Sequence, residues 1–251
     1  CWTRPASAVA YWQTGVKNYN GFDSHLKSVM DFPVEEAIRQ ALENDGQGWG
    51  NGLTRVYDAV AMDYLYGDVN NILLMLGNHD MDRIADVVMD QDPRRVKIAY
   101  TLLATMRGIP QVFYGDEYAM KSADRRMGHS TLRMPLPLGE AVTAEMQDMF
   151  DYQSRLFQWR KGEKVIHTGR TMHFMSRDNT YAYFRYNDEE AVFVFVNASD
   201  ADRTIPTAHY AEILGKYKPV GVDVISGKTY DLSQKDITIE PLSSIVVKLE
   251  K

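Results

Sequence analysis

The chain is short of cysteine and of long apolar runs, and it has no surplus of basic residues. Its single cysteine, Cys1, cannot form an internal disulfide and leaves the compartment open between cytoplasm and periplasm. No apolar run approaches the length of about 18 residues that crosses a bilayer, so we predict no membrane span. With 34 acidic against 28 basic residues, the composition does not indicate nucleic-acid binding. A hydrophobic content of 45% is that of a soluble globular protein.

An apolar run over residues 72–76 ends in Gly77, Asn78, His79 and Asp80. A short apolar run bounded by glycine is typical of a strand buried on both faces, as in parallel sheets. In barrels of alternating strands and helices, catalytic side chains stand at the carboxyl ends of the strands. His79 and Asp80 are therefore candidate functional residues.

A helix and a second strand follow this run. An Asp-Pro pair at residues 92–93 has the pattern of a helix N-terminus, and Gly108 stands where a C-terminal glycine belongs. Residues 109–114 then form a second apolar run. Strand, helix and strand in this order make a right-handed parallel crossover. We therefore expect Asp80 and Glu117, which follow the two runs, on the same rim.

The upstream segment repeats this arrangement. We predict a strand over residues 28–32, a helix over residues 33–42, a glycine-rich loop over residues 44–52 and a second helix over residues 53–64. Up to about residue 159 the chain then consists of three strand-helix units.

From about residue 164 only strand patterns remain. Residues 181–186 and 191–196 flank a polar turn and indicate a β-hairpin. Further strand patterns lie at residues 220–224, 237–239 and 244–249. Short strands joined by polar turns are typical of an antiparallel sandwich. We therefore predict an α/β part over residues 1–162 and an all-β sandwich over residues 163–251.

The strand-helix part is too short to close into a barrel. A (β/α)8 barrel needs eight units and about 250 residues. Three units of apolar strands would leave an unpaired edge open to water or to another chain. The sequence also begins at Cys1 with neither an initiator methionine nor a signal peptide. We expect the chain to be the carboxyl-terminal part of a longer protein.

Four motifs follow one another along the chain: Val9-Ala10-Tyr11-Trp12-Gln13, Ser28-Val29-Met30-Asp31-Phe32-Pro33, Leu76-Gly77-Asn78-His79-Asp80 and Gly108-Ile109-Pro110-Gln111-Val112-Phe113-Tyr114-Gly115-Asp116-Glu117. In this order, and with the terminal sandwich, they resemble the carboxyl-terminal part of the α-amylase family of glycoside hydrolases, especially its neopullulanase and cyclomaltodextrinase members. The resemblance implies a TIM (β/α)8 barrel followed by a β-sandwich, with barrel strands six to eight in this chain. It also implies an activity on starch, maltodextrin, pullulan or cyclodextrin.

The family uses three acids, and the resemblance assigns one of them to this chain. They are an aspartate nucleophile, a glutamate acid/base and a third aspartate after strand seven, which Asp80 matches. The alignment places the glutamate just before Cys1 and Trp2, with the nucleophile further upstream, so the chain alone is predicted to be inactive. The resemblance implies that Asp80 stabilises the transition state by accepting hydrogen bonds from the sugar 2- and 3-hydroxyls, with His79 as a companion donor.

Further rim residues are candidate substrate contacts, namely Asn78, Arg83, Tyr114, Glu117, Asp124 and Trp49. Tyr114 either binds a sugar or has a structural role. Glu117 either contacts substrate or pairs with Arg83 or another rim cation. Asp124 belongs to an Asp-Arg-Arg segment that loosely resembles the family's Asp-x-x-Arg rim segment and is otherwise typical of a solvated loop.

Two tryptophans and one buried acid have competing interpretations. Trp49, in the glycine-rich loop, is the better candidate for an exposed glucan platform, whereas Trp159 is expected in the core. Asp31 is expected to cap a helix or to be a buried structural acid.

Other interpretations stay open at this point. An Asn-His-Asp segment after a strand is also typical of a simple turn. Gly-Asn-His-Asp occurs in metallophosphoesterases too, but the other ligands of a two-metal centre are missing from the sequence, and His167, His173 and His209 lack ligand spacing. We therefore predict neither a metal nor a cofactor. A non-catalytic glucan-binding or amylase-like accessory module is the third alternative.

The sequence leaves several properties of the intact protein undecided. They are the identity of the α-glucan, the choice between hydrolysis and transglycosylation, and the formation of a homo-oligomer. The expected partners are an α-glucan oligosaccharide and the amino-terminal part of the same protein.

Overall fold

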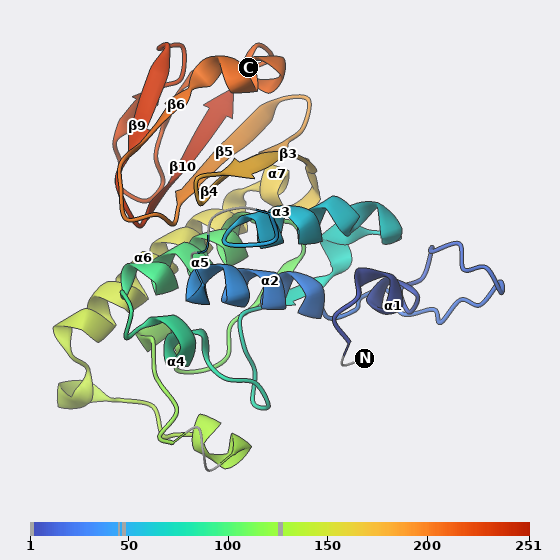
Figure 1. Cartoon of the computed structure of the whole chain (residues 1–251), viewed down its shortest axis with the longest axis vertical. Helices are drawn as coiled ribbons and strands as arrows, with labels where there is room; N and C mark the ends of the chain where they lie inside the picture. Colours follow the sequence, from blue (N-terminus) through green and yellow to red (C-terminus); the bar gives the residue numbers. More distant parts are fainter. Residues whose placement is uncertain (1–2, 45, 47–48, 125–127) are drawn as a thin grey trace.

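The computed structural model describes residues 3–44, 46, 49–124 and 128–251. Helices and a short parallel sheet make up one part of the chain, and an all-β part lies beside them (Figure 1). The helices are α1 (Ala6–Ala10), α2 (Phe32–Glu43), α3 (Thr54–Val60), α4 (Ile84–Val88), α5 (Arg94–Thr105), α6 (Ala144–Gly162), α7 (Lys164–Thr168) and α8 (Ala211–Leu214). The strands are β1 (Leu73–Met75), β2 (Ile109–Gln111), β3 (Arg170–Arg177), β4 (Thr180–Tyr186), β5 (Glu190–Asn197), β6 (Arg203–Pro206), β7 (Val220–Val222), β8 (Thr229–Asp231), β9 (Asp236–Ile239) and β10 (Ser243–Glu250). None of the described helices has the length and apolarity that a membrane crossing requires.

A parallel pair of strands lies at the centre of the helical part. β1 and β2 pair in register, Leu73 with Ile109 and Met75 with Gln111. Because α4 and α5 lie between them in the chain, the expected strand-helix-strand crossover is confirmed. The polar segments that follow the two strands therefore both leave the sheet at the carboxyl end of its strands, which we call the rim.

The strand expected over residues 28–32 is reduced to a single bridge, so this prediction was wrong in extent. Met30 bridges Leu73 in parallel, and Asp31 N donates to Leu73 O at 2.8 Å. The Asp31 carboxylate then accepts a hydrogen bond from Val34 N at 3.2 Å, and α2 begins at Phe32. Capping by Asp31 is thus confirmed, and it ends the extended segment early.

Gly108 lies between the end of α5 and the start of β2. Its φ is +95°, and an added Cβ would lie 2.6 Å from the carbonyl oxygen of Ile72. Only glycine fits a left-handed position with so little space, which explains the predicted stop at this residue. The other end of α5 differs from the prediction by one residue, because Pro93 is the cap and Asp92 accepts a hydrogen bond from Arg94 N at 2.9 Å.

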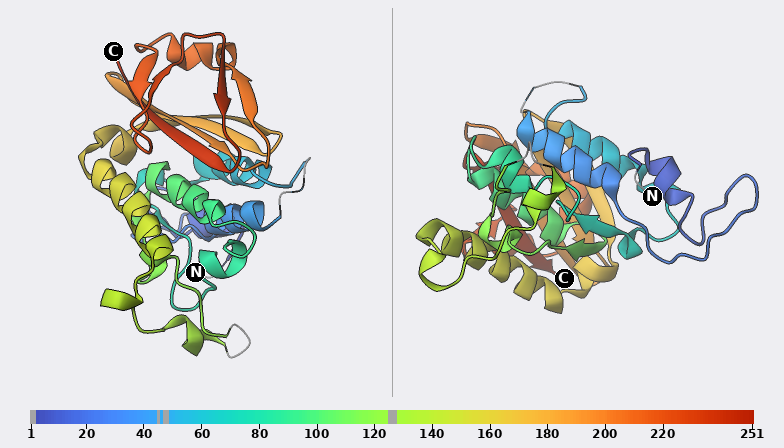
Figure 2. Two further views of the ribbon diagram at one scale, coloured as in Figure 1. Left: turned by 90° about the vertical axis from the view of Figure 1, so that its left-hand side faces the viewer. Right: turned by 90° about the horizontal axis from the view of Figure 1, so that it is seen from below.

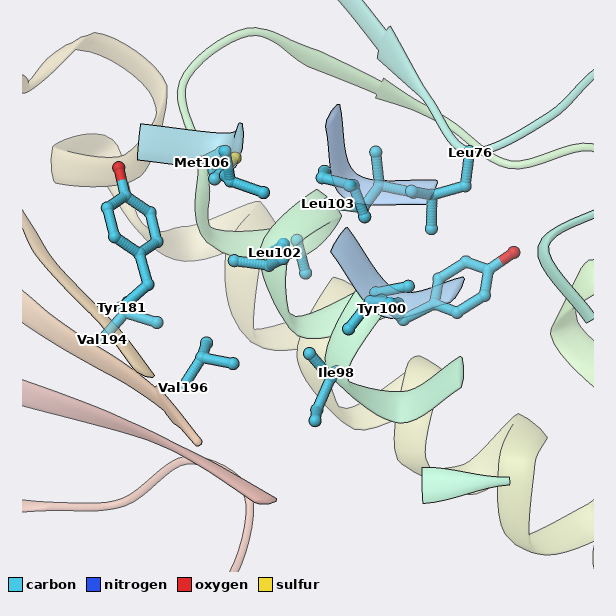
Figure 3. Close-up of a cluster of buried hydrophobic side chains, with 14 of the residues drawn as sticks. Leu76, Ile98, Tyr100, Leu102, Leu103, Met106, Tyr181, Val194 and Val196 are labelled. Atoms are coloured by element: carbon cyan, nitrogen blue, oxygen red, sulfur yellow. The ribbon is translucent and has the colours of Figure 1, made fainter. Parts of the chain in front are cut away.

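The all-β part is built on a sheet that is buried on both faces. Its strands run in the order β10-β5-β4-β3, antiparallel throughout, and β4–β5 is the predicted hairpin. Successive residues of a strand face opposite sides. Tyr181 and Val194 pack with Leu102 on the helical side (Figure 3). Phe184 and Phe193 join a second cluster with residues of β6 and β9. One hydrophobic core therefore connects the sheet to the helices.

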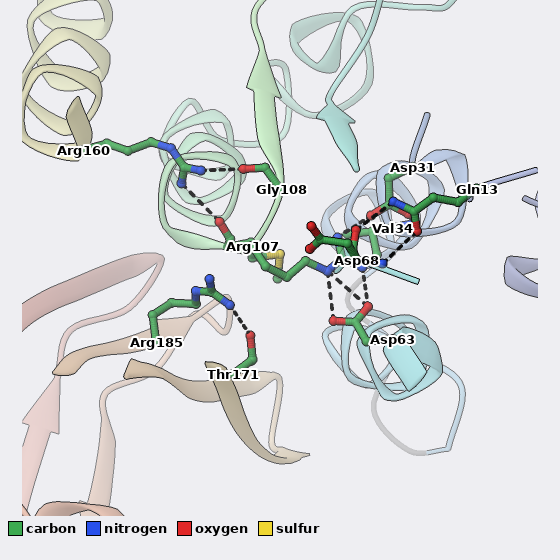
Figure 4. Close-up of polar contacts among 11 residues, drawn as sticks. Gln13, Asp31, Val34, Asp63, Asp68, Arg107, Gly108, Arg160, Thr171 and Arg185 are labelled. Carbon is green, nitrogen blue, oxygen red and sulfur yellow. Dashed lines mark hydrogen bonds and ion pairs between the residues drawn. The ribbon is translucent and has the colours of Figure 1, made fainter. Parts of the chain in front are cut away.

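A buried ion cluster lies at the end of the parallel sheet opposite the rim. Arg107, which nearly adjoins the start of β2, pairs with the carboxylates of Asp31 and Asp63 (Figure 4). The side chains of Arg107 and Asp31 are 1% and 0% exposed. Arg107 thereby links the capping residue of α2 to η1 (Ala61–Leu65) and to the start of β2.

Two further buried arginines bind the same region together. Arg160 of α6 donates to the carbonyl oxygen of Gly108 at 2.6 Å (Figure 4). Arg185 of β4 donates to Thr171 Oγ1 at 2.6 Å and to Asn70 Oδ1 at 2.7 Å. These bonds attach the antiparallel sheet and α6 to the end of the parallel strands opposite the rim, which we call the base.

A fully buried carboxylate in α2 couples folding to pH. Glu35 lies 3.4 Å from Arg39 Nε and 3.4 Å from Arg4 Nη1. Burial, opposed by these two arginines, raises the pKa of Glu35 to about 7 from an ordinary value of 4.5. The folded state therefore keeps a proton that the unfolded state releases, and the free energy of unfolding falls as the pH rises between these two values.

Glu35→Gln is expected to remove this fall, because glutamine keeps the shape of the side chain and does not titrate. The variant should gain stability relative to the natural chain at about pH 8, by a few kcal/mol at most, and gain little near pH 5. Urea unfolding at the two pH values measures the difference. A stability difference that is the same at both pH values would contradict the prediction.

Candidate functional site

A buried arginine holds the segments of the rim together. The side chain of Arg83 is 1% exposed. Its Nη1 donates to the carbonyl oxygen of Tyr114 at 2.8 Å and to Asp116 Oδ1 at 2.6 Å, and its Nη2 donates to the carbonyl oxygen of Leu132 at 2.8 Å. Leu132 ends η5 (His129–Leu132). One side chain thus connects the segment after β1 to the segment after β2 and to η5.

The carboxylate of Asp80 stands on this rim with 37% of the side chain exposed. Its Oδ2 lies 3.2 Å from His79 Nε2, and its Oδ1 lies 3.4 Å from Arg133 Nη2 and 3.5 Å from His129 Nδ1. The backbone N of Asp80 donates to Asn78 Oδ1 at 2.8 Å, which orients the turn. Polar side chains from two segments therefore surround an acid that solvent reaches.

Asn78 and Arg83, both predicted as substrate contacts, are directed into the protein. Asn78 is 6% exposed, and its Nδ2 lies 3.3 Å from Met81 Sδ and 3.7 Å from Met75 Sδ. Both side chains are too buried for the direct substrate contact that the sequence suggested. Their bonds instead fix the segments that carry Asp80 and Tyr114.

Glu117 stands beside the Arg83 ion pair. Of the two roles expected for Glu117, pairing with Arg83 is wrong, because Asp116 occupies that position. Burial raises the pKa of Asp116 to about 6, and the Arg83 guanidinium opposes the rise. Gln153 Nε2 of α6 donates to the carbonyl oxygen of Asp116 at 2.9 Å. Glu117, half-buried in η3 (Asp116–Tyr118), follows this fixed residue directly.

Tyr114 and Asp124 belong to the same side of the molecule. The Tyr114 hydroxyl, on a side chain that is partly exposed, donates to the carbonyl oxygen of Met134 at 3.0 Å. Thr131 Oγ1 donates to the carbonyl oxygen of Asp124 at 3.0 Å. Thr131 belongs to η5 together with His129, which contacts Asp80, so this bond ties Asp124 to the element beside Asp80.

Trp49 lies elsewhere. It is 85% exposed and lines a pocket with Met175 and Asp178, next to the β3–β4 turn. In Figure 2 the sheet that carries this turn and the segment of residues 128–142, which includes His129 and Arg133, lie at opposite ends of the molecule. The structure thus does not bring Trp49 to Asp80. Trp159 packs partly buried against the main hydrophobic core, as predicted.

His129 and Arg133 contact Asp80 and were not predicted. They stand about 50 residues beyond Asp80 in a segment without a regular pattern, so no local spacing connects them to it. The clue in the sequence was only their position downstream of the second apolar run.

Within the part of the chain that the structure describes, no group of three or more His, Cys, Asp or Glu side chains could hold a metal ion. The described residues therefore supply no ligand set for a two-metal phosphoesterase. The predictions that involve Cys1, Trp2, Arg125 and Arg126 lie outside the described residues.

Two family models match the chain. Residues 11–203 match the alpha amylase catalytic domain, and residues 171–248 match the cyclo-malto-dextrinase C-terminal domain. The first match spans more than half of the chain, so the chain belongs to the α-amylase family. The resemblance found in the sequence is confirmed, and the β-rich part corresponds to a C-terminal domain of that family.

The chain also resembles individual family members. It is 25% identical over 232 residues to a cyclomaltodextrin glucanotransferase of Geobacillus stearothermophilus, a match that covers 84% of the chain and 30% of that protein. It is 26% identical over 224 residues to an alpha-amylase of Niallia circulans, covering 84% of the chain and 40% of that protein. The chain therefore spans less than half the length of these curated relatives.

Solved structures show the same fold. The alpha-amylase of Geobacillus thermoleovorans, complexed with acarbose, matches with a TM-score of 0.76 at 19% identity, over 100% of this chain and 52% of that one. At this identity the likeness establishes the fold alone. Together the matches give an α-amylase family fold with a C-terminal β-rich domain, homologous to glycoside hydrolases and transferases.

Proposed function

We propose that the chain is the carboxyl-terminal part of a retaining hydrolase that cleaves α-1,4 bonds in an α-glucan such as starch, maltodextrin, pullulan or cyclodextrin. The observation that carries the proposal is the position of Asp80. Its carboxylate follows a strand of a parallel sheet, is partly exposed, and lies within 3.5 Å of nitrogen atoms from His79, His129 and Arg133. This is the chemistry expected at the carboxyl end of a strand in a (β/α)8 enzyme.

Asp80 has the role of transition-state stabiliser in this proposal. A retaining glycosidase uses one carboxylate as nucleophile and one carboxylic acid as proton donor. Asp80 takes neither role but accepts hydrogen bonds from sugar hydroxyls, which strengthen as the ring approaches the oxocarbenium ion. Its charge also helps to keep a neighbouring acid protonated. The nucleophile and the acid then come from polypeptide upstream of this chain.

The other rim residues divide into two groups. His79, Tyr114, Glu117 and Asp124 are the proposed substrate contacts, since each lies on the rim segments and is at least partly exposed. Asn78 and Arg83 are positioning residues, as are His129 and Arg133 for the Asp80 carboxylate.

We further propose that residues 1–162 are the end of a (β/α)8 barrel and that residues 163–251 are its terminal sandwich. The support is the parallel order of three neighbouring segments, from the Met30 bridge to β1 to β2. Among the described residues the β1–β2 sheet contains no further strand. The outer edge of β2 is therefore open to the remaining strands of a barrel.

Hydrolysis assays test the proposal. The purified 251-residue chain should release no reducing sugar from maltoheptaose or β-cyclodextrin, whereas the protein with its upstream polypeptide should cleave at least one of them. Release of reducing sugar by the 251-residue chain alone, well above a blank, would refute the proposal that the nucleophile and the acid come from upstream polypeptide. A longer protein that binds maltoheptaose without cleaving it would favour the accessory-module alternative.

A further inference from the structure

Two adjoining pockets flank the β3–β4 turn, far from Asp80. One has a volume of about 460 Å³ and lies between the turn, β6 and η7 (Thr207–Tyr210), and the other has about 310 Å³ and lies between the turn and the loop that carries Trp49. They share Met175, Arg177 and Asp178. We call this pair of pockets the turn groove. Each volume is within the range of about 300–1,000 Å³ that is typical of small-molecule sites.

The turn fixes the base of the Trp49 loop. Asn179 Oδ1 accepts a hydrogen bond from Leu53 N at 3.0 Å, and Asn179 Nδ2 donates to the carbonyl oxygen of Ala198 at 3.0 Å. Gly52 has a φ of +49°, and a Cβ there would collide with Asn179 Oδ1. A glycine and a buried amide thus join a loop of the helical part to the sheet. The position of Gly52 and Leu53 beside the β3–β4 turn is therefore fixed by the fold.

The side chains of the groove combine apolar faces with charged planar groups. Trp49 is 85% exposed and Met175 is 47% exposed, so both present apolar surface to solvent. In the larger pocket the rings of Phe174 and Tyr210 meet edge to face with centroids 4.8 Å apart. Arg177 supplies fork-shaped donors beside these rings.

This combination suits a sugar chain. A glucose ring has an apolar face that packs on an aromatic side chain and a rim of hydroxyls that both donate and accept. Asp178 supplies acceptors next to the donors of Arg177, so the groove offers both partners to a hydroxyl. Arg203 and His209 line the larger pocket as well, so donors outnumber carboxylate acceptors there. Inorganic phosphate added to the binding assay described below is therefore a required competitor control, and loss of glucan binding in its presence would assign the pocket to an anion instead.

We propose that the turn groove is a second α-glucan-binding surface, separate from the rim of Asp80. The inference takes its ligand class from the proposed function and adds a place where a long glucan is held away from the cleavage point. Binding at two places on one polymer raises the effective concentration of the substrate at the rim. The groove should therefore matter for polysaccharides more than for short oligosaccharides.

Affinity electrophoresis of the full-length protein in native gels with amylopectin tests the inference. Trp49→Ala should weaken the retardation, with an increase in the apparent Kd of about fivefold or more for the loss of one aromatic anchor. Tyr64→Ala is the matched control, because Tyr64 is 77% exposed on η1 and is outside the groove. The control should migrate like the natural protein.

A second variant keeps the inference testable if Trp49→Ala does not fold. Arg177→Met removes the guanidinium donors and leaves Trp49 itself unchanged, and it should also weaken retardation by about threefold or more. Circular dichroism identifies which variants are folded. If the folded variants are retarded as strongly as the natural protein, or if the natural protein is not retarded, the inference is wrong.

The cleavage assay and the retardation assay together separate this inference from the proposed function. A failed proposed function appears as a natural full-length protein that does not cleave maltoheptaose, whatever its retardation. A failed inference appears as normal cleavage with retardation that does not depend on Trp49 or Arg177.

Discussion

Asp80→Asn in the full-length protein is expected to lower kcat for maltoheptaose by about 10²- to 10⁴-fold. The proposed contacts of Asp80 with the sugar hydroxyls contribute several kcal/mol in the transition state, and each 1.36 kcal/mol corresponds to about a tenfold change in rate. Asparagine has nearly the same volume as aspartate but no negative charge. The hydrogen bonds to the sugar hydroxyls therefore weaken, and the pKa of the proposed general acid is no longer raised by the charge of Asp80. KM should change far less than kcat, because these contacts strengthen mainly as the ring flattens.

The fold should tolerate this change. The Asp80 side chain is partly exposed, and its oxygen atoms lie 3.2–3.5 Å from the nitrogen atoms of its partners. At the surface each such ion pair contributes less than about 1 kcal/mol to stability. Thermal unfolding of the variant should therefore coincide closely with that of the natural protein. Asp90→Asn is the matched control, since Asp90 is 84% exposed and pairs with Lys121. Near-normal turnover by Asp80→Asn would remove Asp80 from the mechanism.

Local patterns predicted much of the fold, and their failures have local causes. The run before Asp80, the stop at Gly108 and the β4–β5 hairpin all depend on residues close in sequence, and all three are confirmed. The strand expected before α2 is mostly absent because Asp31 caps the helix at once. β3 was missed because its half-exposed residues do not alternate cleanly between apolar and polar.

The site was predictable only in part. The place of Asp80 and His79 on the rim could be predicted because they follow a strand pattern. The contacts of Asp80 with His129 and Arg133, and the pairing of Arg83 with Asp116 rather than Glu117, depend on tertiary packing between distant segments. Trp49 illustrates the opposite error. Its exposure was predicted correctly, but sequence could not tell which end of the molecule its loop approaches.

Arg107→Met is expected to be the most destabilising single change at the base of the parallel strands. The Arg107 guanidinium is buried between the carboxylates of Asp31 and Asp63, whose side chains are 0% and 19% exposed. Methionine has an apolar side chain of comparable length, so little packing is lost. The two acids, however, remain in place without their cation. Breaking a buried pair in this way costs about 3–5 kcal/mol.

Urea unfolding of the natural chain and the variant measures this loss. Lys121→Met is the control, because it removes a lysine from a surface pair with Asp90 and should cost less than about 1 kcal/mol. Adding Asp63→Asn to Arg107→Met should recover part of the loss, since one uncompensated charge is removed from the cluster. A loss below about 1 kcal/mol for Arg107→Met would mean that water reaches both carboxylates and that the cluster does not stabilise the base. The recovery in the double variant distinguishes an electrostatic cause from poor packing, because the carboxylate is neutralised without restoring any contact of the arginine.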